Sequence, residues 1–213
     1  MEHSYSQLAQ DKNVVDFYKA KTGGYFVEIG AYDGIALSNT FALEKQYGWK
    51  GICVEPLVSR FNDLVKNRKA HCCDLAVYHT SDLDVFFDIE GDSGMLSGIN
   101  VHIDAHKYTV NKNKKTVTVK TISLNDLLER YNAPNFIEYL SLDTEGSEFE
   151  ILKNLDFSKW KFGLLDVEHN HIEPRRTMIR KLLLANGYKY IGPNHFDDSY
   201  QLIALEESSS SCP

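Results

Sequence analysis

The stretch YFVEIGAYDG, residues 25–34, decides the fold of this chain. Its first half is a short apolar run that predicts a buried strand, and Gly30 ends that strand. A helical pattern follows from Ser38 to about Tyr47. A glycine between a strand and a helix permits a tight turn and lets a ligand approach the backbone closely. The stretch therefore predicts an α/β fold with a ligand site at the end of its first strand.

Strands and helices continue to alternate along the chain. Further strands are predicted at 51–55, 70–78, 139–143 and 162–168, and further helices at 57–65, 148–155 and 175–186. Strand–helix–strand units of this kind build a parallel sheet. The last two predicted strands, 188–191 and 200–205, have no helix between them, so they form a hairpin and give the sheet an antiparallel member.

The middle of the chain departs from this alternation. Residues 85–89 and 115–123 have strand patterns, and Ser123 with Asp126 resembles a helix cap. We interpret residues 85–120 as a flap inserted into a single domain of residues 1–207, with a disordered tail at 208–213. The glycines within residues 92–98 would allow the flap to close over a ligand, although an ordinary surface loop fits equally well.

The bulk composition fits one soluble globular domain of 213 residues with a net charge of −7. This acidic balance disfavours nucleic acid as a partner. No apolar run is long enough for a membrane span, and the polar N-terminus lacks a secretory signal. The four cysteines form no metal-binding pattern and indicate free thiols in the cytoplasm. A homodimer through an exposed sheet edge is also consistent with the sequence.

Acidic residues end three successive predicted strands. Glu55 ends the second strand, where a carboxylate can accept hydrogen bonds from ribose hydroxyls, and Asp74 lies where an acid can bind an adenine amino group. The first turn lacks the GxGxxG pattern, and Glu28 and Asp33 would repel a pyrophosphate. The same two acids suit a ligand with an amine or a sulfonium. The pattern favours S-adenosylmethionine over NAD.

These segments resemble the FkbM-type methyltransferases, a family of S-adenosylmethionine-dependent O-methyltransferases. The resemblance covers residues 24–205 and rests on VEIGAYDG (27–34), SNT (38–40), CVEP (53–56), LSLDTEGSE (140–148) and VEHN (167–170). It implies a Rossmann-like class I methyltransferase fold, with a seven-stranded sheet of order 3-2-1-4-5-7-6, strand 7 antiparallel and helices on both faces. It also implies methylation of hydroxyl groups on sugars and other small molecules. The predicted cofactor pocket comprises Glu28, Gly30, Ala31, Asp33, Gly34, Ser38, Glu55, Pro56, Asp74, Leu75, Ala76, Asp143 and Glu145.

An acceptor hydroxyl must lose its proton, and two routes fit the sequence. His169 or His171 could act as a general base near the end of the fifth strand. Alternatively, Asp143, Glu168 and Asn170 could hold Mg²⁺ or another divalent cation that lowers the pKa of the hydroxyl. The candidate catalytic residues are therefore Asp143, Glu168, His169 and His171.

The sequence thus predicts an O-methyltransferase that acts on a hydroxyl of a small molecule, most plausibly a sugar or glycan. Three alternatives stay open. An NAD-dependent oxidoreductase is disfavoured by the acidic first turn, and an RNA methyltransferase by the pI of about 5.6. The third is an inactive S-adenosylmethionine-binding protein that serves as an interaction module, which the intact acids Glu28, Glu55 and Asp143 argue against.

Overall fold

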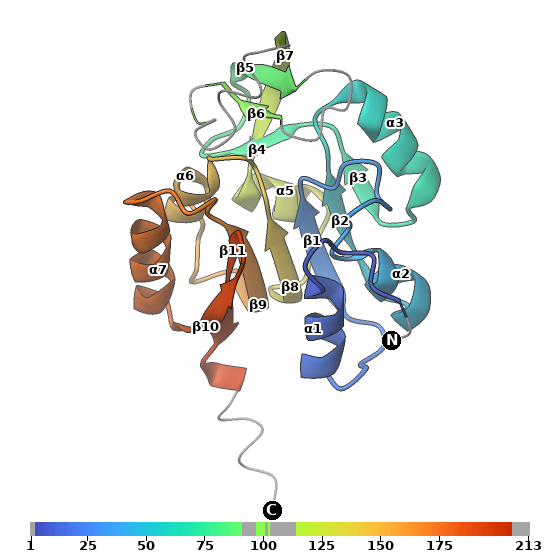
Figure 1. Ribbon diagram of the computed structural model, residues 1–213, viewed down its shortest axis with the longest axis vertical. Helices are drawn as coiled ribbons and strands as arrows, with labels where there is room; N and C mark the ends of the chain where they lie inside the picture. Colours follow the sequence, from blue (N-terminus) through green and yellow to red (C-terminus); the bar gives the residue numbers. More distant parts are fainter. Residues whose placement is uncertain (1–2, 91–96, 101, 103–113, 206–213) are drawn as a thin grey trace, which may run out of the picture.

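A seven-stranded sheet forms the centre of the molecule (Figure 1). The computed structural model describes residues 3–90, 97–100, 102 and 114–205. The strands, in their order across the sheet, are β10 (Tyr188–Asn194), β11 (Asp197–Leu202), β9 (Lys161–Glu168), β8 (Phe136–Leu142), β1 (Tyr25–Ile29), β2 (Lys50–Val54) and β3 (His71–Cys73). Strand β11 is antiparallel to both of its neighbours, and the pairs from β9 to β3 are parallel. The predicted strand order and its antiparallel member are confirmed.

Helices cover both faces of this sheet, as expected. One face carries α1 (Gln10–Phe17), α2 (Phe41–Tyr47) and α3 (Val58–Asn67), and the other carries α5 (Leu124–Arg130), α6 (Glu148–Lys153) and α7 (Arg175–Ala185). The polar N-terminal segment gave no expectation of a helix, yet α1 forms there and buries Val14 and Val15 against the sheet. None of the described helices combines the length and the apolar character that a bilayer span requires.

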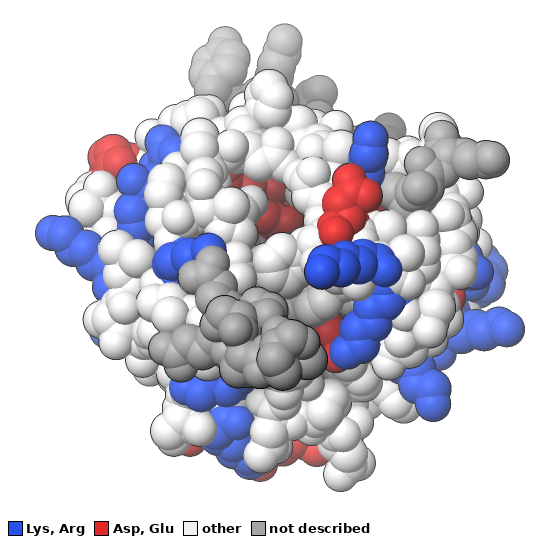
Figure 2. Space-filling view, turned by 90° about the horizontal axis from the view of Figure 1, so that it is seen from below, with Lys and Arg blue, Asp and Glu red and all other residues white. Residues whose placement is uncertain are grey.

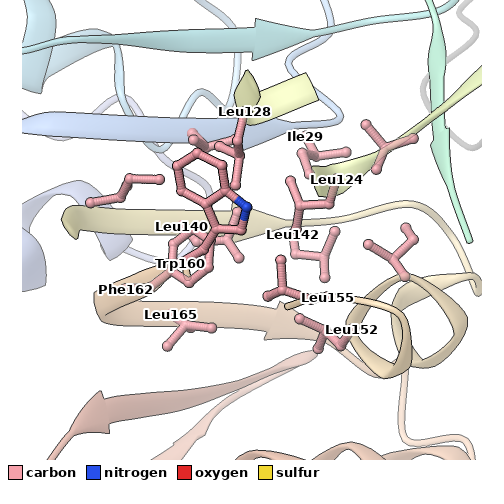
Figure 3. Packing of buried hydrophobic residues seen from close by; sticks show 14 of the residues in the cluster. Ile29, Leu124, Leu128, Leu140, Leu142, Leu152, Leu155, Trp160, Phe162 and Leu165 are labelled. Atoms are coloured by element: carbon pink, nitrogen blue, oxygen red, sulfur yellow. The ribbon is translucent and has the colours of Figure 1, made fainter. Parts of the chain in front are cut away.

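The core follows from the alternation of side chains along the central strands. Strands β8 and β9 are buried almost throughout, as expected for parallel strands with helices on both sides. Leu140 and Leu142 of β8 point to the face of α5 and α6, whereas Tyr139 points to the face of α1 and α2. Figure 3 shows Leu140, Trp160 and Phe162 packed with leucines of the neighbouring elements.

A second sheet lies beyond the ends of the parallel strands, at the top of Figure 1. Its strands, in order, are β4 (Ala76–Tyr78), β7 (Lys114–Ser123), β5 (Asp84–Glu90) and β6 (Gly98–Ile99). The predicted strands at 85–89 and 115–123 belong to it. Ser123 caps α5 by accepting a hydrogen bond from the Asp126 N–H at 3.1 Å, as predicted.

The strand predicted over residues 70–78 is wrong as a single element. The chain leaves the central sheet after Cys73 and enters the second sheet at Ala76, where it pairs with the end of β7. The partner strand lies about 45 residues further along the sequence, so local pattern could not reveal the break. The flap remains a prediction, because residues 91–96, 101 and 103–113 lie outside the described residues, as does the tail at 208–213.

Candidate functional site

A pocket of about 280 Å³ lies at the carboxyl ends of the central strands. The ends of β1, β2, β8 and β9 supply its floor, which is where open α/β sheets bind ligands. Phe87 and Ile99 of the second sheet close one end, and Gln7, Leu8 and Gln10 of the N-terminal segment line another part of the wall. Sequence analysis did not predict that residues of the N-terminal segment line the pocket, because isolated polar residues near a short helix form no recognisable binding motif.

Glu28 lines the pocket, but its carboxylate is occupied by the protein itself. The Ser38 hydroxyl donates to both Glu28 oxygens at 3.0 and 2.9 Å, and the Asn39 N–H donates to Oε1 at 2.6 Å. The Thr40 hydroxyl and Arg68 Nη1 reach Oε2 at 2.7 and 3.2 Å. The predicted cofactor residues Glu28 and Ser38 are therefore bound to each other, and Glu28 shapes the loop that borders the pocket.

Arg68 is the partner that sequence analysis did not identify. Its side chain is fully buried, and besides Glu28 it donates to Glu44 at 3.0 Å and to Thr40 at 2.8 Å. A Cβ atom at Gly34, whose φ is +81°, would lie 2.7 Å from Arg68 Cγ. Gly34 thus makes room for the guanidinium stem and lies outside the pocket lining.

The turn after β1 brings its first residues to the pocket. Gly30 and Ala31 both line it. Gly30 has a φ of +87°, and a Cβ there would lie 2.3 Å from the backbone oxygen of Asp143. The predicted cofactor residue Asp33 lies outside the lining, because its carboxylate accepts from the N–H groups of Ile35 and Ala36 and closes a local turn.

Glu55 lies at the pocket as predicted, together with Pro56. Its two oxygens accept from the Tyr32 N–H at 3.1 Å and the Leu57 N–H at 2.9 Å, which fix the carboxylate at the end of β2. Burial raises the pKa of Glu55 to about 7, and the two N–H groups offset part of that effect. A buried carboxylate held in this way can accept hydrogen bonds from a diol.

Of the residues predicted to read an adenine ring, the structure brings only Ala76 to the pocket. Asp74 is exposed, and neither it nor Leu75 belongs to the lining. The reason is the break between β3 and β4, which turns these two residues away as the chain changes sheets. Ala76 instead joins Val77, Phe87 and Ile99 in an apolar end of the pocket.

Three carboxylates meet at the other end. Asp143, Glu145 and Glu168 each present an oxygen within 4.8 Å of the others. The carboxyl groups of Asp143 and Glu168 are hydrogen-bonded to each other. The partial loss of bulk water inside the pocket, with the neighbouring acids, raises the pKa of Asp143 to about 6, that of Glu145 to about 9, and that of the buried Glu168 well above its usual range. The convergence of Asp143 and Glu168 was predicted.

The third predicted metal ligand occupies a different position. Asn170 lines the pocket, but its side-chain nitrogen donates to Glu145 at 3.3 Å. Glu145, and not Asn170, is the third member of the carboxylate group with Asp143 and Glu168. Glu148 orders the turn that carries Glu145, because its Oε1 accepts from the N–H groups of Thr144 and Gly146 at 3.0 and 2.9 Å.

The two histidines do not reach the pocket. His169 is buried, its Nδ1 accepts from the His171 N–H at 2.9 Å, and its Nε2 faces Asp198 at 3.4 Å. His171 is exposed and packs against the rings of His169 and Phe196. A general base needs a lone pair directed at its substrate. The predicted role of either histidine as a base is therefore not supported by its position.

Comparison of the sequence with known protein families gives one match. A family model described as a methyltransferase FkbM domain matches residues 28–190, more than half of the chain. No curated protein matches the sequence.

Three similar solved structures are methyltransferases of low sequence identity. The precorrin-6y C5,15-methyltransferase of Geobacter metallireducens GS-15 is 11% identical, with a TM-score of 0.45 over 89% of this chain and 84% of that one. A methyltransferase of Pyrococcus furiosus is 12% identical, with a TM-score of 0.44 over 92% and 81%. A delta-N METTL16 methyltransferase domain is 12% identical, with a TM-score of 0.46 over 91% and 79%.

Replacement of the buried guanidinium tests the network behind the pocket. Arg68→Met should lower the free energy of unfolding by about 3–5 kcal/mol, because the buried Glu28 charge would lose its counterion and Glu44 would keep only its pair with Lys45. Urea denaturation measures the change. Lys66→Met, at an exposed position in the last turn of α3 just before Arg68, should cost less than about 0.5 kcal/mol. Equal effects of the two variants would show that the network does not stabilise the fold.

The raised carboxyl pKa values predict a pH dependence of stability. Glu55, Asp143, Glu145 and Asp197 have pKa values of about 7, 6, 9 and 7, raised by burial, whereas carboxyls in an unfolded chain titrate near about 4. The folded protein then holds more protons than the unfolded chain between about pH 5 and 9, so its free energy of unfolding should fall as pH rises. Urea denaturation across this range measures the slope, and a rising free energy would contradict the assignment.

Proposed function

The chain belongs to the FkbM methyltransferase family, and on this premise we propose that it transfers a methyl group from S-adenosylmethionine to a hydroxyl of a small molecule of the sugar or glycan class. One observation carries the proposal. A single pocket holds a fixed diol-binding acid, Glu55, at one position and a proton-accepting pair, Asp143 and Glu168, at another. On this proposal, one cavity contains one set of residues that binds the methyl donor and a separate set that activates the acceptor.

The residues at the first position fit the donor. The Glu55 carboxylate suits the ribose hydroxyls, and the exposed Gly30, which has no side chain, lets the ligand lie against the turn. The apolar end formed by Val77 and Phe87 suits an adenine ring. When bound, S-adenosylmethionine supplies an electrophilic methyl carbon, whose bond to sulfur breaks as its bond to the acceptor oxygen forms.

Asp143 is the residue we assign as general base. It presents exposed surface to the pocket, and a pKa of about 6 leaves it mostly ionised at neutral pH while keeping it a useful proton acceptor. Glu168, whose pKa is raised well above its usual range, is hydrogen-bonded to Asp143 and keeps that carboxylate oriented. The hydroxyl proton passes to Asp143 as the acceptor oxygen is methylated.

A divalent cation is the second candidate for this step. Asp143, Glu145 and Glu168 offer the hard oxygen ligands that Mg²⁺ and Ca²⁺ prefer, and the buried Glu168 Oε2 has no hydrogen-bond partner among the described residues. A metal held there would lower the pKa of an acceptor hydroxyl. The two routes differ in their response to chelation.

The charge of the pocket supports a small neutral or cationic acceptor. Seven acids line it, namely Glu28, Glu55, Asp143, Glu145, Asp166, Glu168 and Asp197. No Lys, Arg or His occurs among the described lining residues, so phosphate groups are disfavoured there.

On the face shown in Figure 2, Lys and Arg side chains form separate groups with uncharged surface between them, whereas nucleic-acid-binding proteins usually gather them into a patch.

Calorimetry with S-adenosylhomocysteine tests the donor site. The wild-type protein should bind this ligand and not NAD, and Glu55→Gln should weaken the affinity by about tenfold or more, because two ribose hydroxyls lose a charged acceptor. Glu129→Gln, on the exposed surface of α5, is the control. Binding of NAD would favour an oxidoreductase. Failure to bind either S-adenosylhomocysteine or NAD would favour an inactive interaction module.

Turnover assays test the proton acceptor. With a panel of sugars and polyols, Asp143→Asn should reduce S-adenosylhomocysteine formation by about 10²-fold or more while calorimetric affinity for that product changes little. Excess EDTA separates the two routes, since activity that persists in EDTA excludes the metal. Wild-type activity in Asp143→Asn would remove Asp143 from the mechanism.

A further inference from the structure

The acid expected to bind an ammonium group in this pocket is not available. Both oxygens of Glu28 already accept hydrogen bonds from the protein, and Oε2 also pairs with Arg68. A carboxylate with these partners gains little from another cation, because its charge is already compensated. An ammonium ligand in the same cavity needs a different acid.

Asp197 meets that requirement. It begins β11 opposite Glu168 in the strand register, is only 9% exposed and lines the pocket. Its Oδ2 accepts from Gln10 Nε2 at 2.8 Å, while within the described part of the chain no donor reaches Oδ1. The Gln10 amide is fixed in this orientation because its Oε1 accepts from the Leu8 N–H at 2.9 Å.

The neighbouring Asp198 shows what distinguishes Asp197. Asp198 points to the opposite face of the sheet, where Arg176 and Arg180 donate to its carboxylate at 2.7 and 2.8 Å. Together with His169, these contacts hold the pKa of Asp198 far below the usual range despite burial. Asp197 has no basic partner among the described residues, and burial raises its pKa to about 7. One of two adjacent buried acids is thus neutralised by the protein, and the other is left to a ligand.

We propose that Asp197, positioned by Gln10, is the ammonium-binding subsite of the pocket. A primary ammonium has three donors and no acceptor, which suits a carboxylate oxygen without another donor. The inference rests on the proposed function, within which two ligands carry such a group: the amino-acid end of the methyl donor, or an amino group on the acceptor.

Calorimetry with two nucleosides separates these sources. S-adenosylhomocysteine carries the amino-acid end, and 5′-methylthioadenosine lacks it. If the subsite holds the donor, Asp197→Asn should weaken S-adenosylhomocysteine binding by about tenfold or more and leave 5′-methylthioadenosine unchanged. Gln10→Ala, which keeps the carboxylate, should give a smaller loss. Asp74→Asn, an exposed acid outside the pocket lining, is the control.

If the ammonium belongs to the acceptor, both nucleosides should bind Asp197→Asn normally. Ligand-observed NMR on protein saturated with S-adenosylhomocysteine should then show glucosamine binding more tightly than glucose to the wild type, and this preference should disappear in Asp197→Asn. Unchanged binding of S-adenosylhomocysteine and glucosamine in a variant that still binds 5′-methylthioadenosine would overturn the subsite. Failure of the wild type to bind 5′-methylthioadenosine would instead overturn the proposed donor.

Discussion

The buried guanidinium of Arg68 is the contact on which the architecture of the pocket depends. It joins Glu28 near the end of β1 to Glu44 in α2. Because Arg68 directly follows α3, it connects the sheet, the loop at 34–40, α2 and the end of α3. Residues 30–40 contain no regular strand or helix, so their shape comes from side-chain hydrogen bonds of this kind. Glu28 is consequently part of the scaffold, and the proposed function assigns ligand recognition to Glu55 and to the acids of the later strands.

Much of this arrangement was predictable because parallel strands place their carboxyl ends at one edge of a sheet. Once the strands were located from their apolar runs, Glu55, Asp143 and Glu168 had to converge, and the structure brings all three to one cavity. The strand order and the antiparallel final strand followed from the resemblance and from the absence of a helix before β11. Gly30 was also identified correctly, since a turn of this kind requires a residue without a side chain.

The remaining features depend on contacts between distant segments, which local patterns do not contain. Arg68 has no motif that marks it as a partner of Glu28, forty residues earlier. Asp74 was placed by extending a strand that instead changes sheets to pair with β7. The direction of His169 is set by the turn after β9, where Asn170 and His171 have positive φ, so its ring lies away from the cavity. Each of these errors concerns a residue beyond the end of a regular element.

The raised pKa values of Asp143 and Glu168 have a thermodynamic consequence for any ligand that brings positive charge to this pocket. Such a ligand lowers the pKa values of the surrounding acids, and part of their bound protons must leave as it enters. Complex formation is then a proton-exchange reaction with the solvent. The observed heat of association would vary with the ionisation enthalpy of the buffer, and the apparent affinity would rise with pH although no histidine occurs among the described lining residues.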